Sequence, residues 1–206
     1  MAQQNKIIEG AKKIYSDIVQ HLTNDGRINT ESLLLITSGL AGMSCQMAVR
    51  KIAEQKNFPV KSVLMEIGCQ NGTRYYMGDN LNYFLLEGSQ SVWNMTVTFC
   101  HQFFPEISAP DMNQYAAECV KHLGDENYQL WGYIPENQEI LILKELWTNY
   151  FPDVKLSCET PENMPLLFGI VMQAAFMDIA EVMGTETCLS MALENLLLSA
   201  KLDYQA

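Results

Sequence analysis

The chain has 206 residues, of which 48% are hydrophobic and 10% aromatic, and its net charge is −11. This composition supports one hydrophobic core, so we expect a single domain over residues 1–206. An acidic chain lacks the basic patches that bind nucleic acids and anionic membranes, and we therefore expect neither as a partner.

The charge is unevenly distributed along the chain. Residues 1–103 hold 8 acidic and 9 basic side chains, whereas residues 104–206 hold 16 acidic and 4 basic ones. An acidic half can select a cationic partner. The commoner explanation, and the one that we favour at this point, is a solvated surface that keeps the protein soluble.

Six cysteines occur in the chain, and none of them forms a CxxC pair. Most lie within apolar patterns, which is typical of cysteines that serve as small hydrophobic residues in a reducing compartment. The first residues, MAQQNKIIEGAKK, contain no apolar signal-peptide core. We therefore predict a cytoplasmic protein.

The first predicted element is an amphipathic helix over residues 3–22, where apolar side chains recur at three- and four-residue spacing. Asn24, Asp25 and Gly26 follow it and form a turn signal. The helix therefore ends just before this turn, and a second helix begins after it.

Residues 33–49 form the stretch around which we expect the fold to be built. No charged residue lies between Ser32 and Arg50, and the run is apolar on nearly every side of a helical wheel. Such a helix is buried either in a protein core or in a membrane. Because the run is shorter than the ~20 residues that span a bilayer, we predict the central core helix of a soluble domain. Asn29 or Thr30 can cap it.

Small residues line this central helix at helical spacing, and two of them are Gly39 and Gly42. Glycine inside a helix costs roughly 0.5–1 kcal/mol relative to alanine, so both positions indicate a close approach of another group. That group is either a ligand or a neighbouring helix. We favour tight helix packing.

A β-hairpin is predicted at about residues 60–78. Asn71 and Gly72 are the preferred pair for a two-residue type I′ turn. That turn places Ile67 opposite Tyr76 in an antiparallel pair. The hairpin must then pack on the helices or meet a further strand, because an isolated hairpin is only marginally stable in water.

The candidate for that further strand is residues 128–134. The rest of the chain is predicted to be helical from its apolar periodicity and its breakers. The expected helices cover residues 81–86, 92–104, 110–123, 138–151, 161–183 and 186–202. We therefore predict a mainly α fold, a compact multi-helix bundle around a buried central helix, with one small antiparallel β-hairpin.

The run from Met164 to Met177 is a second stretch without charge, and it includes Gly169. We predict that it forms another buried helix and packs beside the central one. In this interpretation Gly169 lies near Gly39 and Gly42, so that glycines on both helices bring the two backbones close together.

No motif assigns an activity to the chain. The sequence has no P-loop, no GxGxxG after a strand, no HExxH and no GxSxG. None of the three histidines has a second ligand at a convincing metal spacing. We therefore predict no catalytic residues, no metal and no cofactor.

A polar cluster remains as the candidate ligand-binding site. If the hairpin exit folds over the central helix, several polar and aromatic side chains converge on one cavity, as in many ligand pockets. Each of them also has a structural interpretation as a cap, a core amide, a packed thiol or a core aromatic ring. The candidates are Cys45, Gln46, Asp79, Asn80, Asn82, Trp93 and His101.

Three functional hypotheses follow. The first is a non-enzymatic interaction protein, expected to form a homodimer through the hairpin edge or the C-terminal helix, because twelve methionines suit adaptable contact surfaces. The alternative is a protein that binds a small apolar ligand in a cavity between the two charge-free helices. The least favoured is an enzyme that uses Cys45, His101 or Asp79.

Overall fold

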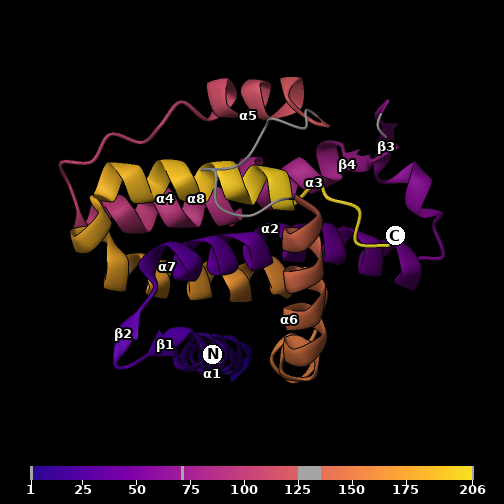
Figure 1. The fold of residues 1–206 in the computed structure, drawn as a ribbon. Coiled ribbons are helices and arrows are strands. Elements are labelled where there is room, and N and C mark those ends of the chain that lie inside the picture. The colour runs from indigo at the N-terminus through magenta and orange to yellow at the C-terminus, as the bar shows by residue number, and fades with distance from the viewer. Residues whose placement is uncertain (1, 71, 125–135, 206) are drawn as a thin grey trace.

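The computed structural model describes residues 2–70, 72–124 and 136–205. Its fold is the predicted mainly α bundle with a small antiparallel hairpin (Figure 1). The α-helices are α1 (Ala2–Leu22), α2 (Thr30–Gln55), α3 (Asp79–Asn82), α4 (Val92–Phe103), α5 (Met112–Lys121), α6 (Glu136–Ser157), α7 (Asn163–Met183) and α8 (Thr185–Ser199). The strands are β1 (Thr23–Asn24), β2 (Arg27–Ile28), β3 (Met65–Gly68) and β4 (Arg74–Met77).

Helix α2 is the centre of the bundle, as predicted. Asn29 caps its first turn, and the Asn29 side chain accepts a hydrogen bond from the backbone N–H of Ser32 at 2.9 Å. Almost every residue from Leu33 to Val49 is buried. Helices α7 and α8 make the most extensive contacts with it and run alongside it (Figure 1). A helix without charge is thus accommodated by neighbours on several sides.

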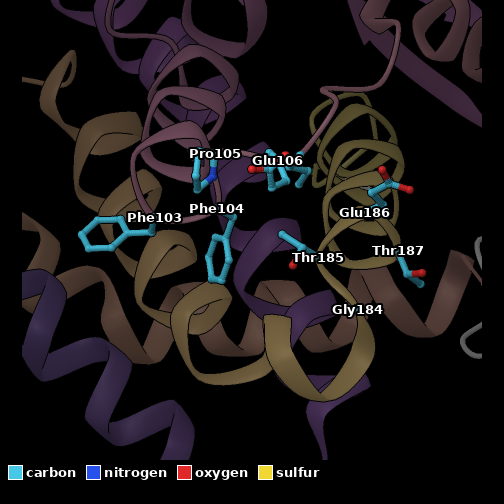
Figure 2. A pocket seen from close by; sticks show the side chains of 9 residues that line it. Phe103, Phe104, Pro105, Glu106, Gly184, Thr185, Glu186 and Thr187 are labelled. Carbon is cyan, nitrogen blue, oxygen red and sulfur yellow. The ribbon is translucent and has the colours of Figure 1, made fainter.

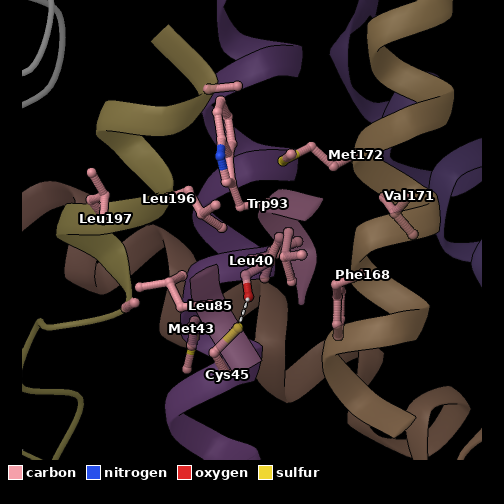
Figure 3. Packing of buried hydrophobic residues seen from close by; sticks show 14 of the residues in the cluster. Leu40, Met43, Cys45, Leu85, Trp93, Phe168, Val171, Met172, Leu196 and Leu197 are labelled. Atoms are coloured by element: carbon pink, nitrogen blue, oxygen red, sulfur yellow. Dashed lines mark hydrogen bonds between the residues drawn. The ribbon is translucent and has the colours of Figure 1, made fainter. Parts of the chain in front are cut away.

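The glycines of the two charge-free helices do not meet, and this part of the prediction is wrong. A methyl group at Gly42 would lie 2.5 Å from the carbonyl oxygen of Leu196 on α8. A methyl group at Gly169 would lie 2.5 Å from the terminal carbon of Met95 on α4. Helices α2 and α7 are still neighbours, but bulky side chains such as Phe168 fill the core between them (Figure 3). Each glycine therefore makes room for a helix other than its predicted partner: α8 at Gly42 and α4 at Gly169.

The hairpin β3–β4 has a register one residue away from the predicted one. Ile67 lies opposite Tyr75, not Tyr76. The N–H of Cys69 donates to the carbonyl of Thr73, so the loop between them has three residues where a type I′ turn would have two. A shift of one residue exchanges the two faces of a strand. Both Tyr75 and its neighbour Tyr76 are buried, so this strand is covered on two sides.

The chain after α8 extends this hairpin. The N–H of Tyr76 donates to the carbonyl of Lys201 at 2.8 Å, and Tyr75 forms an antiparallel bridge with Leu202. The C-terminal segment therefore lies between the hairpin and the bundle. The strand predicted at residues 128–134 lies outside the described residues.

Helix α6 differs from its prediction at its end. It was expected to stop before Pro152 but continues to Ser157. A proline inside a helix removes one hydrogen bond and crowds the preceding turn. Pro152 is exposed, so the carbonyl that loses its partner is available to water. This explains how the helix tolerates the proline.

Candidate functional site

The seven predicted pocket residues lie in different environments. Cys45 and Trp93 belong to the apolar core (Figure 3). The thiol of Cys45 donates to the carbonyl of Ala41 within its own helix at 3.4 Å. Burial raises the pKa of the Cys45 thiol, which keeps it protonated and a poor nucleophile.

Gln46 is a structural amide. Its side chain is fully buried and donates to the carbonyls of Ala200 and Leu202, both at 3.0 Å. Its amide oxygen accepts a hydrogen bond from Nε of Arg50 at 3.0 Å. These bonds tie the C-terminal segment to α2 and leave Gln46 engaged with protein groups.

Asp79 and Asn80 are the two candidates that share a cleft. They line an open depression of about 580 Å³ beside the hairpin, where Asn80 donates to the carbonyl of Val63 at 3.1 Å. Asn82 is half-buried and His101 is exposed, and neither lines this cleft. The structure therefore does not gather the predicted set into one cavity.

Three other buried cysteines are poor nucleophiles. Burial raises the pKa of Cys100 to about 12, that of Cys158 to about 12 and that of Cys188 to about 11. Thiols with such values are almost entirely protonated at neutral pH. Across residues 2–70, 72–124 and 136–205, no group of three or more histidine, cysteine or acidic side chains is placed to hold a metal ion.

The two charge-free helices differ in how well the protein covers them. Both α2 and α7 have the length and hydropathy of a membrane-spanning helix. In the most apolar window, 83% of α2 is buried inside the protein but only 50% of α7. An apolar helix with an uncovered side is the clearest unusual surface in this fold.

The uncovered side of α7 is a stripe beside α4. Residues three and four apart share one side of a helix. The amide of Gln173 donates to the carbonyl of Met95 at 3.0 Å, which places this stripe next to α4. All members of the stripe are at least partly exposed, and Met177 is 43% exposed. The stripe consists of Leu166, Ile170, Gln173 and Met177.

Helix α4 adds aromatic rings to this surface. Met95 and Phe99, four residues apart, lie on the side of α4 that meets α7. The rings of Phe99 and Phe103 have centroids 4.7 Å apart, and Phe103 is 48% exposed. We name the combined surface the α4–α7 face. It comprises Met95, Phe99 and Phe103 of α4 and Leu166, Ile170, Gln173 and Met177 of α7.

One end of the α4–α7 face opens into a cleft of about 610 Å³ between the loop after α4 and the first turn of α8. In Figure 2, Phe104 and Pro105 lie on one side of it, and Thr185 and Glu186 on the other. Phe104 packs on the buried ring of Phe176, with centroids 5.9 Å apart, so the aromatic wall is anchored in the core.

A smaller cleft of about 170 Å³ lies at the other end, between the turn before α4 and the first turn of α7. Tyr83 and Phe84 contribute aromatic rings, packed edge to face with centroids 5.4 Å apart. Glu162 is its charged residue. Both ends of the α4–α7 face therefore combine aromatic rings with glutamate.

The segments that carry α4 and α7 contain no lysine or arginine, although α1, which also packs on α7, supplies Lys6 as the partner of Glu159. Residues 75–120 hold five aspartates and glutamates, and residues 156–200 hold six, but neither segment has a lysine or arginine. Together they include α3, α4, α7, α8 and all of α5 except Lys121, which pairs with Glu118. The described lining of the 610 Å³ cleft has Glu106 and Glu186 as its charged residues. The α4–α7 face is thus apolar with an acidic margin.

Comparison with known proteins adds no relative: no protein-family model, curated protein or solved structure matches the chain. No residue therefore takes a role by analogy. The α4–α7 face was also not anticipated from the sequence, where the run from Met164 to Met177 indicated only a buried helix.

Proposed function

We propose that this protein is a non-enzymatic binding protein that holds another protein against its α4–α7 face. The observation that carries the proposal is the uncovered stripe of α7, which the bond from Gln173 to Met95 places beside α4 and its exposed Phe103, with a cleft at each end. Contiguous exposed apolar surface on a soluble domain is typical of a protein–protein contact.

The candidate catalytic groups give no support to the competing enzyme hypothesis. Cys45 is protonated and buried, while His101 and Asp79 are exposed on different elements. A nucleophile needs a base within hydrogen-bonding reach, and no such pair involves these three residues in the described contacts. Binding is the simpler proposal.

Homodimerisation stays a prediction. The fold leaves one of the two predicted interface surfaces more accessible than the other. Most of α8 is buried, and α5 lies over it (Figure 1). Of the two surfaces predicted from the sequence, the edge of β3 is the more accessible, with Met65 exposed. Light scattering over a range of concentrations tests the dimer. A molar mass that stays at the monomer value at all concentrations would exclude the dimer.

The apolar-ligand alternative also stays a prediction. Leu40, Phe168, Val171 and Met172 are fully buried in the region between α2 and α7 (Figure 3). A ligand in this region would have to displace packed side chains, which is costly. A metabolite and lipid screen by thermal shift tests it, since a ligand that binds only the folded state raises the melting temperature. Cytoplasmic location likewise remains a prediction.

Photo-crosslinking tests the proposed function directly. A benzophenone side chain replaces Phe103 on the α4–α7 face or, as a matched control, Leu156, which is 77% exposed on α6. We expect discrete adducts with another protein from position 103 and not from position 156. Identical adduct patterns at the two positions, or no adduct at position 103, would overturn the proposal.

A further inference from the structure

We infer that the segment held by the α4–α7 face is a lysine- or arginine-rich amphipathic helix of a partner protein. The inference rests on the proposed function and adds the chemistry of the partner. An apolar face shared by two neighbouring helices can take the apolar side of a third helix. The 12 residues of α4 give the face a length of about 18 Å.

The positive charge inferred for the partner follows from the glutamates at the two ends of the α4–α7 face. Glu106 and Glu186 border one end, and Glu162 borders the other. None of these three glutamates takes part in an ion pair among the described residues, and residues 75–120 and 156–200 contain no lysine or arginine. A basic helix places cations against these carboxylates while its leucine-like side chains cover the apolar stripe.

The two kinds of contact have different roles. Exposed ion pairs each contribute little to stability and are screened beyond about 8 Å at physiological salt. Burial of apolar side chains such as Met177 and Phe103 supplies most of the affinity. The acidic margin instead selects cationic partners and speeds their association.

The same margin disfavours a second copy of this chain on the face. A two-fold symmetric dimer places the same surface patch of both subunits against itself. Glutamates at both ends would then meet glutamates, and like charges across an interface are unfavourable. The α4–α7 face therefore selects a different protein.

The cleft beside the hairpin differs from the α4–α7 face in its charge. Lys61, Glu66 and Asp79 all line it, so both signs of charge are present. A surface with mixed charges does not discriminate between cationic and anionic partners in the way that a margin of one sign does. Charge selection is thus specific to the α4–α7 side among the clefts described.

Three synthetic helices of about 14 residues, which span about 21 Å, test the inference. All carry leucine at three- and four-residue spacing, and their polar positions are all lysine, all glutamine or all glutamate. Fluorescence anisotropy with a labelled peptide measures the dissociation constants. We expect the lysine peptide to bind about tenfold more tightly than the glutamine peptide, and the glutamate peptide most weakly.

Matched variants test whether the glutamates at the cleft cause the preference for the lysine peptide. E106Q combined with E186Q removes two charges at the cleft, and E9Q combined with E145Q removes two exposed charges elsewhere. We expect the first pair to weaken binding of the lysine peptide about fivefold without changing that of the glutamine peptide. The second pair should leave both unchanged. Circular dichroism melting confirms that all variants are folded.

The outcomes separate the inference from the proposed function. Equal binding of the three peptides, equal effects of the two variant pairs, or no binding of the lysine peptide would each overturn the inference. In each case position-dependent crosslinking at Phe103 would still support a protein partner of another chemistry. Its absence would overturn the proposed function itself.

Discussion

Helices α2 and α7 have nearly the same sequence character but different surroundings. Each contains a long stretch without charge. Helix α2 is enclosed by α7, α8, α6 and the C-terminal segment, whereas α7 keeps one stripe uncovered beside α4. The difference lies in the neighbours and not in the helices.

This comparison shows that an uncharged helix marks buried surface only where neighbours cover all of it. On α2 the small residues admit the backbone of α8, and the helix becomes the core. On α7 the outward residues Leu166, Ile170 and Met177 stay accessible. An apolar stripe that the described residues leave uncovered is available for a partner.

The largest effect on stability is expected from Gly42→Ala, for which Gly169→Ala is the matched comparison. Gly42→Ala places a methyl group 2.5 Å from the carbonyl oxygen of Leu196 and 2.8 Å from the amide nitrogen of Ala200, both backbone atoms. We expect a loss of about 3 kcal/mol in the free energy of unfolding, the upper end for overpacking. Gly169→Ala meets only the flexible end of Met95 and should cost less than about 1 kcal/mol.

Urea denaturation of both alanine variants measures these costs. Equal losses would show that α2 and α7 are packed with the same tightness, contrary to the comparison.

The second effect concerns the amide that fastens the C-terminal segment over α2. Gln46→Leu leaves the carbonyls of Ala200 and Leu202 without their side-chain donor in a buried region. We expect a loss of about 2 kcal/mol in the free energy of unfolding. Gln173→Leu on the uncovered side of α7 is the matched control and should cost less than about 1 kcal/mol. A similar cost for the two would argue against a tighter enclosure of α2.

The third prediction is a pH dependence at Lys201, in the same segment. Burial lowers the pKa of Lys201 from 10.5, although the nearby thiol of Cys119 raises it slightly. Between the folded pKa and about 10.5, the unfolded chain binds a proton that the folded protein has released. The contribution of Lys201 to the free energy of unfolding therefore rises with pH up to about 10.5. Below the folded pKa the buried charge carries its full cost, despite the bond from Nζ to the carbonyl of Leu197 at 2.7 Å.

Lys201→Met removes this titration. We expect the variant to be at least as stable as the wild type at pH 7, with an advantage that shrinks as the pH approaches 10.5. Chemical denaturation of both proteins at several pH values gives the difference. A difference that is constant with pH would contradict burial of the amine.

The smallest effect on stability is expected on the uncovered stripe. Met177→Gln replaces a side chain that is 43% exposed, so the free energy of unfolding should change by less than about 0.5 kcal/mol. Binding of the lysine peptide should nevertheless weaken several-fold, because the apolar contact is lost. A large loss of stability with unchanged binding would assign Met177 to the core of the fold.

Local signals predicted the elements well. Asn29 and Ser91 accept hydrogen bonds as helix caps at the expected starts of α2 and α4. Apolar periodicity located the helices, and the absence of charge identified α2 as the core. These features depend on neighbours within a few residues, which is the range that sequence patterns report.

Turn residues were less decisive. Asp25 and Gly26 both adopt positive φ and form the two-residue turn between β1 and β2, as such a pair favours. Asn71 and Gly72 suggested the same turn, yet the pairing of Tyr76 with Lys201 accompanies a longer loop and another register. Tertiary contacts override a local preference that amounts to only a few tenths to one kcal/mol.

The candidate site could not be predicted from local pattern. The polar residues that were expected to converge lie on elements whose relative placement depends on long-range packing, as Gln46 shows by turning to the C-terminal segment. The stripe on α7 was missed because a run without charge has the same appearance whether or not one side is covered. The available signal was the absence of lysine and arginine from residues 75–120 and 156–200.

Methionine methyl NMR tests the central claim most directly, because α7 itself carries a matched pair. Met172 is fully buried, and Met177 is 43% exposed on the α4–α7 face. With a soluble gadolinium chelate, we expect strong broadening of the Met177 methyl signal and little change for Met172 or for Met43 on α2. Addition of the lysine peptide should then protect Met177 and Met95. Equal broadening of Met172 and Met177, or no protection by the peptide, would contradict an uncovered stripe on α7 that binds a partner.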